Sequence, residues 1–219
     1  MLEIIPSILT NEVKEFNKLL DKLTSIALPK YDFLGRVQID INDGTFLGVK
    51  TVEPQLLSEL KSNLKFDYHL MVSDPTSWIR RCVHADRIIG QIEHMDNQSD
   101  FINEVKKWGL KVGFAVDYAT NLDELNSDDL EILDVILLMA YPAGMGGQDF
   151  KEEVFNKIEK LKDLRSSRGC NFRICLDGGI DSDNIKRVKL AGADEVVIGK
   201  RITEGNIEEN FEKFYKASH

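Results

Sequence analysis

One complete repeat of the pattern that decides the fold lies at residues 135–179, which read VILLMAYPAGMGGQDFKEEVFNKIEKLKDLRSSRGCNFRICLDGG. It begins with an apolar run, Val135–Met139, and passes through a glycine-rich loop into Phe150–Leu164, where apolar residues recur every three or four positions. A second short run, Arg173–Leu176, follows and ends at Asp177. Short continuous apolar runs are typical of strands buried on both faces, and the spacing between them is typical of a helix. The segment therefore predicts two parallel strands joined by a helix.

The same alternation continues on both sides of this segment and predicts a barrel. The expected strands are Ile4–Leu9, Val37–Ile41, Phe66–Met71, Arg87–Ile92, Val112–Val116, Val135–Met139, Arg173–Leu176 and Glu195–Ile198. The expected helices include Asn11–Leu23, Pro54–Lys61, Asp100–Trp108, Phe150–Leu164 and Asp183–Leu190. Eight β/α units fit a closed (β/α)8 TIM barrel, whereas an open doubly wound sheet usually has fewer strands. Because no Pro-, Gly- or Ser-rich linker divides the sequence, we expect a single α/β barrel domain over residues 1–219.

Composition and charge exclude several classes of protein. Hydrophobic residues make up 42% of the sequence, and no apolar run approaches the roughly 20 residues of a membrane span, so we expect no membrane association. The net charge of −9 lacks the basic footprint of a nucleic-acid-binding protein. Cys82, Cys170 and Cys175 form no C-x-x-C pair, which argues against a disulfide framework and a zinc knuckle. No basic segment with a long apolar run opens the sequence, and we expect a cytoplasmic protein.

Polar residues occupy the expected strand ends, where barrels of this kind carry their chemistry. Alternation along the second strand places Gln38, Asp40 and Asn42 on one face, so that Asp40 points into the barrel. Asp177 ends the seventh strand in the same way. Two inward carboxylates are costly to bury unpaired, so we expect a metal ion, a shared proton or a polar ligand. The alternatives are that both are turn or capping residues and that His69 is a hydrogen-bonded core histidine.

Glycines gather after the last three expected strands. They are Gly144, Gly146 and Gly147, then Gly178 and Gly179, and finally Gly199. Glycine lets backbone N–H groups approach an anion, and the loops after strands seven and eight form the common phosphate site of this architecture. We therefore expect a phosphate ligand. The alternative is that tight turns between strands and helices simply require positive φ angles.

Five strings of sequence occur in a fixed order along the chain. They are Pro6-Ser7-Ile8-Leu9, Asp40-x-x-Asp43-Gly44, His69-Leu70-Met71-Val72, Gly144-x-Gly146-Gly147-Gln148-x-Phe150 and Asp177-Gly178-Gly179-Ile180. Together they resemble the ribulose-phosphate 3-epimerase family, and the resemblance spans nearly the whole sequence. It implies a TIM barrel of the ribulose-phosphate binding type. It also implies a metal-assisted inversion at C3 of a keto-sugar phosphate, such as the exchange between ribulose 5-phosphate and xylulose 5-phosphate.

The resemblance assigns catalytic and metal-binding roles to four residues. Asp40 and Asp177 match the two acid/base positions, where a base removes a weakly acidic proton while a cation stabilises the enediolate. The family holds a divalent metal (Zn, Mn, Mg or Fe) with two His and the same two Asp. His69 matches one of those histidines, and Gln38 stands in the place of the other. A Gln carbonyl oxygen is a poorer ligand for zinc but is tolerated by manganese or magnesium.

The resemblance also implies the residues that contact the substrate. They are Ser7, His69, Met71, Met139, Gly144, Gly146, Gly147, Gly178, Gly179, Gly199 and Lys200. Lys200 replaces the family's usual Ser, and it either reaches the phosphate as a point charge or projects into solvent beside Arg201. The implied partner is a small sugar phosphate, and family members commonly form homo-oligomers, which we expect here.

Departures from the family leave a second function open. Asn42 replaces a family Met, and Gln91 appears where the family often has His. With Gln38, these changes are compatible either with an active epimerase or with a catalytically weakened member that binds a sugar phosphate or a partner without turnover. A related phosphate-binding decarboxylase or aldolase is less compatible, because residues 40–43 lack the lysine of the Asp-x-Lys-x-x-Asp string.

Overall fold

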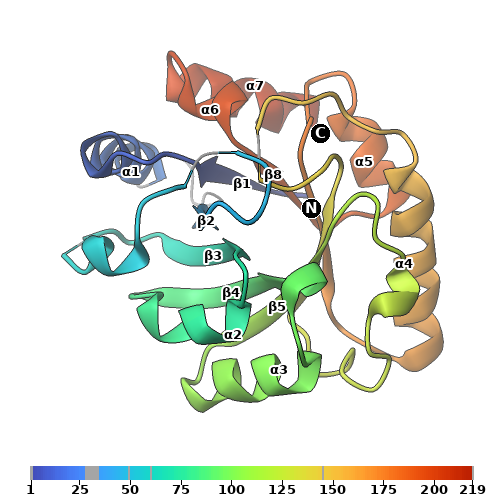
Figure 1. The fold of residues 1–219 in the computed structure, drawn as a ribbon. Helices are drawn as coiled ribbons and strands as arrows, with labels where there is room; N and C mark the ends of the chain where they lie inside the picture. Colours follow the sequence, from blue (N-terminus) through green and yellow to red (C-terminus); the bar gives the residue numbers. More distant parts are fainter. Residues whose placement is uncertain (1, 28–34, 49, 60, 145, 219) are drawn as a thin grey trace.

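The computed structural model describes residues 2–27, 35–48, 50–59, 61–144 and 146–218. In these residues, eight parallel strands pair in chain order and β8 pairs with β1, which closes the barrel (Figure 1). The strands are β1 (Glu3–Ile8), β2 (Arg36–Asn42), β3 (Lys65–Met71), β4 (Ala85–Gln91), β5 (Lys111–Val116), β6 (Val135–Met139), β7 (Arg173–Asp177) and β8 (Glu195–Ile198). The predicted (β/α)8 barrel is confirmed.

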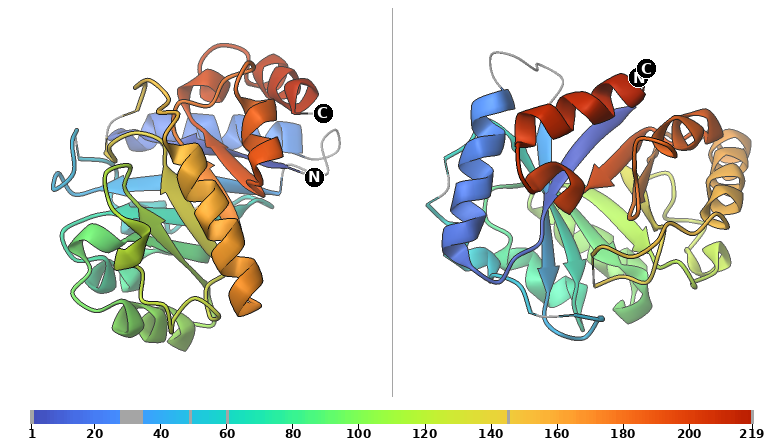
Figure 2. Two further views of the ribbon diagram at one scale, coloured as in Figure 1. Left: turned by 90° about the vertical axis from the view of Figure 1, so that its right-hand side faces the viewer. Right: turned by 90° about the horizontal axis from the view of Figure 1, so that it is seen from above.

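Helices surround the strands on the outside, as the two views in Figure 2 show. They are α1 (Val13–Ala27), α2 (Pro75–Trp78), α3 (Gln98–Lys107), α4 (Val154–Arg168), α5 (Ile185–Ala191), α6 (Lys200–Thr203) and α7 (Ile207–Ala217). Four 3-10 turns also occur among the described residues: η1 (Pro54–Leu57), η2 (Ile79–Arg81), η3 (Ile92–His94) and η4 (Leu122–Glu124). The longer helices pack on the strands through an apolar stripe, such as the buried Phe16, Leu20 and Leu23 of α1.

The predicted helix at Pro54–Lys61 is wrong. In the described part of this connection, which leaves out residues 49 and 60, the structure has the single 3-10 turn η1. Its buried residues, Pro54 and Leu57, are three positions apart and therefore align on one side of a 3-10 turn. Leu56 is 61% exposed, so it adds no buried contact that would hold a longer helix against the strands.

The interior of the barrel is divided into layers along its axis. Alternate strand residues form an apolar middle layer, which includes Ile5, Ile89, Val135, Leu137 and Val197. The alternating strand residues between them pack outward against the helices in a separate and larger core. Each strand is therefore buried on both faces, as the continuous apolar runs in the sequence predict.

Ion pairs fill the N-terminal end of the barrel. Arg87 lies between two carboxylates, with its Nη2 atom 2.5 Å from Asp67 Oδ2 and 2.7 Å from Glu195 Oε2. Arg36 pairs with Asp67 from the other side. None of Asp67, Arg87 and Glu195 is more than 2% exposed. Buried charges are tolerated only when they are paired, so this layer depends on each member having its partners.

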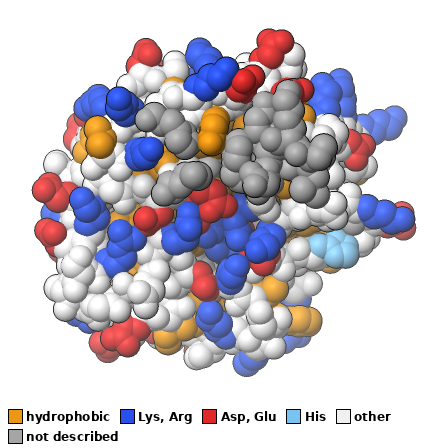
Figure 3. Space-filling view, turned by 180° about the vertical axis from the view of Figure 1, so that it is seen from behind, with side chains coloured by type: hydrophobic (Ala, Val, Ile, Leu, Met, Phe, Trp, Pro, Cys, Tyr) orange, Lys and Arg blue, Asp and Glu red, His pale blue; other side chains and the backbone are white. Residues whose placement is uncertain are grey.

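Charged side chains of both signs lie on the molecular surface. Figure 3 shows the molecule from behind, with Lys and Arg side chains gathered around acidic side chains near the centre of this face. Exposed pairs of this kind stabilise a protein only slightly. Among the described residues, no helix is long and apolar enough to cross a membrane.

Asp43 connects the loops after β2 and β3 above the C-terminal end of the barrel. Its Oδ2 atom accepts hydrogen bonds from the backbone N–H and the hydroxyl of Ser73, both at 2.9 Å. Its Oδ1 atom accepts a bond from the Thr45 N–H at 2.9 Å. Burial alone raises the pKa of Asp43, but the bonds from Ser73 and Thr45 outweigh it and lower the pKa to about 2.

Replacement of Asp67 tests the ionic layer. Asp67→Ala leaves Arg36 without its closest carboxylate and Arg87 with only one, so we expect the free energy of unfolding to fall by about 3–5 kcal/mol. Urea unfolding measures the change. The control is Glu53→Gln, which breaks an exposed pair with Arg81 and should change the stability by no more than about 0.5 kcal/mol. Equal effects of the two substitutions would contradict a structural role for the buried layer.

Asp43→Asn tests the connection between the two loops. The amide has one acceptor oxygen where the carboxylate has two, so we expect a loss of about 1 kcal/mol at neutral pH for this partly exposed group. The direction in which the stability changes with pH follows from the lowered pKa of Asp43. The stabilisation is present above pH 3.8 and is lost as the pH falls toward 2, so wild type and variant should converge there. A difference that is constant from pH 7 to pH 2 would contradict this assignment.

Candidate active site

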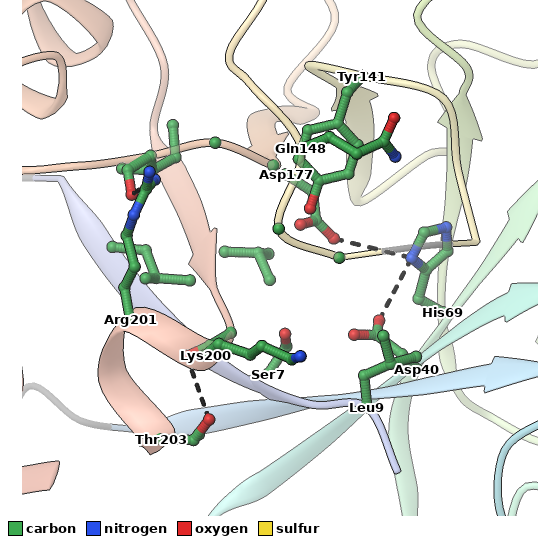
Figure 4. Close-up of a pocket in the computed structure, with 18 of the residues that line it drawn as sticks. Ser7, Leu9, Asp40, His69, Tyr141, Gln148, Asp177, Lys200, Arg201 and Thr203 are labelled. Carbon is green, nitrogen blue, oxygen red and sulfur yellow. Dashed lines mark hydrogen bonds and ion pairs between the residues drawn. The ribbon is translucent and has the colours of Figure 1, made fainter. Parts of the chain in front are cut away.

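Two carboxylates and an imidazole converge inside the C-terminal mouth of the barrel (Figure 4). Asp40 of β2 and His69 of β3 are partners in the strand register, so their side chains stand side by side. Asp177 reaches the same point from the end of β7. His69 Nδ1 lies 3.5 Å from Asp40 Oδ1 and 3.8 Å from Asp177 Oδ2. All three residues are buried, and His69 is completely so.

Gln38 joins the two carboxylates from below. Its amide nitrogen donates hydrogen bonds of 2.7 Å to both Asp40 Oδ1 and Asp177 Oδ2, the same two oxygens that face His69. The choice between amide nitrogen and oxygen follows from this network, because an amide oxygen in this position would be repelled by both carboxylates. In this arrangement Gln38 is therefore a hydrogen-bond donor to the carboxylates. Its predicted role as a metal ligand requires the amide to turn so that Oε1 faces inward.

The electrostatics of this cluster favour a positive charge at its centre. Burial, followed by the charge of Asp40, raises the pKa of Asp177 to about 7, while His69 and Gln38 oppose the shift. Burial alone lowers the pKa of His69, but the closeness and the charge of Asp40, and then the charge of Asp177, outweigh burial and raise that pKa. Asp177 thus tends to hold a proton near neutral pH, which moderates the repulsion between the two carboxyl groups.

The residues present fit a divalent cation. His69 Nδ1 has no hydrogen-bond partner of good geometry among the described residues, although it is buried and faces two carboxylate oxygens. The ligand atoms of Asp40, His69 and Asp177 all lie within 4.8 Å of one another. One imidazole nitrogen and two carboxylate oxygens form a donor set that suits zinc, iron or manganese. A cation at this point would give the orphaned nitrogen its partner.

A pocket of about 340 Å³ opens above this cluster. Every predicted site residue lines it except Gln38, which lies beneath Asp40 and Asp177 and is 1% exposed. The lining residues among those predicted are Ser7, Asp40, His69, Met71, Met139, Gly144, Gly146, Gly147, Asp177, Gly178, Gly179, Gly199 and Lys200. Met145, within the glycine-rich loop, lies outside the described residues. Figure 4 shows the Lys200 side chain extending toward Ser7, so Lys200 contributes a positive charge to the pocket.

The glycines that line the pocket differ in the structural requirement that each of them meets. Gly178 has a φ of 112°, and a Cβ there would lie 2.7 Å from the ring of Tyr141, so local backbone and packing explain it. Gly146 has no positive φ, and among the described residues other than its chain neighbours only Leu9, at 3.7 Å, lies near the position of an added Cβ. The missing side chain at Gly146 leaves open space in the pocket wall, which a ligand can occupy.

Two site residues carry roles that the sequence analysis did not assign. Tyr141 covers Gly178 and lines the pocket, and burial and the charges of Asp177 and Asp40 raise its pKa. Asn42 donates hydrogen bonds of 3.3 Å to the carbonyls of Leu47 and Gly144, which ties the loop after β2 to the loop after β6. For Asn42 the sequence signal is its place where the family has Met.

Comparison with known proteins identifies the family of this chain. Residues 3–203 match the model of the ribulose-phosphate 3 epimerase family. The chain is 33% identical over 175 residues to ribulose-phosphate 3-epimerase of Treponema pallidum, covering 78% of this chain and 80% of that one. It is 29% identical over 206 residues to the chloroplastic ribulose-5-phosphate-3-epimerase of Arabidopsis thaliana, covering 91% of this chain and 70% of that one.

Solved structures agree with the fold. KGPDC from Streptococcus mutans superposes with a TM-score of 0.69 at 12% identity, covering 100% of this chain and 97% of that one. A 3-hexulose-6-phosphate synthase superposes with a TM-score of 0.66 at 10% identity over the full length of both chains. At such low identity these structures bear on the fold alone. The family match and the epimerase relatives go further, and by them the chain belongs to the ribulose-phosphate 3-epimerase family.

Proposed function

We propose that the protein is an epimerase that inverts C3 of a keto-sugar phosphate, ribulose 5-phosphate and xylulose 5-phosphate or a close variant. The observation that carries the proposal is the convergence of Asp40, Asp177 and His69 at the floor of a pocket lined by glycine loops. Family membership and the names of the relatives support it. Inversion needs two proton-transfer groups, one for each face of the carbon, and the site has two carboxyl groups.

The two carboxyl groups divide the acid and base roles. In one direction Asp40 removes the C3 proton, and Asp177 returns a proton to the opposite face; in the reverse direction the roles exchange. The raised pKa of Asp177, about 7, supports this division because it allows that group to hold a proton near neutral pH. Gln38 keeps both carboxyl groups in place through its two 2.7 Å hydrogen bonds.

Asp40, His69 and Asp177 would hold a divalent metal ion at their point of convergence. When bound, the metal supplies electrostatic stabilisation for the negative charge that develops on the substrate oxygens. His69 would bind through Nδ1, since its other nitrogen is hydrogen-bonded to Gln91 at 3.0 Å.

The opposite end of the pocket would bind the phosphate group. The loops at Gly178, Gly179 and Gly199 offer backbone N–H groups, and Lys200 adds a positive charge. Ser7 lies between this end and Asp40, where its hydroxyl can hydrogen-bond a sugar hydroxyl (Figure 4).

The second candidate function is a sugar-phosphate-binding protein without turnover. One observation favours it: the Gln38 amide nitrogen faces the two carboxylates, so a metal must displace two hydrogen bonds in order to bind with Gln38 as a ligand. Turnover of ribulose 5-phosphate distinguishes the two functions directly.

Asp177→Asn tests the acid/base assignment. An amide cannot accept or return a proton, so we expect kcat to fall by about 100- to 10,000-fold while KM changes little. The measurement is the conversion of ribulose 5-phosphate to xylulose 5-phosphate in deuterated water, followed by NMR, because Asp40 alone can still exchange the C3 proton on its own face without inverting the carbon. Asp163→Asn, at an exposed position of α4, is the matched control and should keep full conversion. Wild-type conversion by Asp177→Asn would exclude Asp177 from the reaction.

Gln38→His tests the metal site. The imidazole offers a lone pair where the amide now presents N–H groups, so we expect Zn²⁺ to bind more tightly and activity at low metal concentration to rise. Calorimetric titration of the metal-free protein with Zn²⁺ measures the affinity. Gln38→Leu is the control, because it removes the donor without adding a ligand and should bring no gain in activity. If wild type and Gln38→His both fail to bind metal and to turn over substrate, the binding function takes first place.

A further inference from the structure

A chain of hydrogen bonds runs behind His69, on the side away from the carboxylates. His69 Nε2 lies 3.0 Å from Gln91 Oε1, and Gln91 Nε2 donates to Glu93 Oε2 at 2.8 Å. The other oxygen of Glu93 accepts the backbone N–H of Asp117 at 2.7 Å. His69 and Gln91 are both completely buried, so neither can exchange these partners for bulk water.

The donor and acceptor roles along this series of hydrogen bonds are set at the end farthest from His69. A backbone N–H can only donate, and the N–H of Asp117 occupies one oxygen of Glu93. The remaining Glu93 oxygen is also only an acceptor, so Gln91 must turn its amide nitrogen toward it. Gln91 is then left with its carbonyl oxygen facing His69, and the imidazole must donate from Nε2.

The consequence appears at the other nitrogen of His69. With the proton on Nε2, a neutral His69 directs the lone pair of Nδ1 toward Asp40 Oδ1 and Asp177 Oδ2, at 3.5 and 3.8 Å. A lone pair facing two carboxylate oxygens is unfavourable unless a cation lies between them. This tautomer is therefore the one that prepares the cluster to bind a cation.

We propose that Glu93 is a positioning residue, which acts through Gln91 to hold His69 in the Nε2–H tautomer and so keeps Nδ1 available to a divalent cation. The use of that cation in epimerisation rests on the proposed function, but the tautomer does not. Glu93 is not among the described residues that line the pocket. Its effect on the metal reaches the site only through the two intervening side chains.

Asp117, whose backbone N–H ends this series of hydrogen bonds, is itself held in place by further hydrogen bonds. Asp117 Oδ2 accepts the backbone N–H of Ala143 at 2.7 Å, which fixes the loop after β5 against the loop after β6. Lys157 of α4 donates three bonds of 2.6–2.8 Å to the carbonyls of Asp117, Tyr118 and Thr120. Because the Asp117 N–H cannot easily turn away, a change at Glu93 must be accommodated on the Gln91 side.

Glu93→Gln is the test, because it keeps the shape and removes one acceptor. Its single oxygen pairs with the Asp117 N–H, and its amide nitrogen then faces Gln91. Gln91 turns over, presents its own nitrogen to His69, and makes Nε2 an acceptor. We therefore expect the ring proton to move to Nδ1, and we expect Zn²⁺ affinity to fall by about 10- to 100-fold.

The primary readout is the tautomer of His69 in the metal-free protein. Long-range ¹H–¹⁵N NMR of the histidine rings, at a pH where the ring is neutral, distinguishes an Nε2–H from an Nδ1–H ring. The wild type should give the first pattern and Glu93→Gln the second. Zn²⁺ titration by calorimetry is the second readout, and thermal unfolding checks that each variant is folded.

The matched control exchanges the two side chains. In the double variant Gln91→Glu with Glu93→Gln, the new carboxylate accepts from His69 at one oxygen and from the new amide nitrogen at the other. The new amide oxygen still accepts the Asp117 N–H, so the bonds to His69 and to Asp117 keep their direction and only the bond between positions 91 and 93 is reversed. We expect the Nε2–H tautomer and the Zn²⁺ affinity to return. Asp117→Asn, which keeps the backbone donor, should leave the tautomer unchanged.

Two results would overturn the proposal. One is an Nε2–H ring with wild-type Zn²⁺ affinity in Glu93→Gln, and the other is a double variant that behaves like the single one. If Glu93→Gln does not fold, Gln91→Leu provides the same test, since loss of the acceptor should abolish the single tautomer and weaken Zn²⁺. A wild-type protein with the expected tautomer but no turnover of ribulose 5-phosphate would count against the epimerase function alone.

Discussion

The rest of the site depends on one constraint, which is that two buried carboxyl groups must be held close together despite their repulsion. Asp40 and Asp177 come from strands on different sides of the barrel, and their facing oxygens share the same neighbours. Like charges in a poorly solvated mouth repel unless a proton, a cation or hydrogen-bond donors lie between them. Gln38 supplies donors from below and His69 lies beside them. Burial, together with the part of this repulsion that the neighbours do not remove, raises the pKa of Asp177.

The barrel keeps such a cluster together because its interior leaves little freedom. Parallel pairing places Asp40 beside His69, and closure between β8 and β1 prevents the strands from separating. At the opposite end, Asp67, Arg87 and Glu195 form a second polar layer, with apolar residues between the two. A slip of one residue in the register would exchange inward and outward side chains, exposing these charges to the apolar outer core. The buried charges therefore disfavour wrong registers as well as requiring the correct one.

The sequence predicts what depends on local pattern and misses what depends on distant partners. Strand β6 has the predicted bounds because a continuous apolar run with turn residues on both sides leaves little choice. Asp40 faces inward because alternation in a strand is geometrically strict. By contrast, Gln38 finds its second partner at Asp177, 139 positions along the chain, and nothing near Gln38 indicates which amide atom faces that carboxylate. The Pro54–Lys61 helix was wrong because a short amphipathic segment also suits one 3-10 turn.

Two amide side chains control the cluster, and they differ in how freely they can turn. The orientation of Gln38 is set by Asp40 and Asp177 themselves, so a cation that neutralises these carboxylates removes the reason for its nitrogen to face inward. The orientation of Gln91 is set by Glu93, whose other oxygen is committed to a backbone N–H outside the cluster. Arrival of a cation does not alter that donor. Gln38 can therefore respond to the metal, whereas Gln91 holds the His69 ring with its Nδ1 atom directed toward the carboxylates in both states.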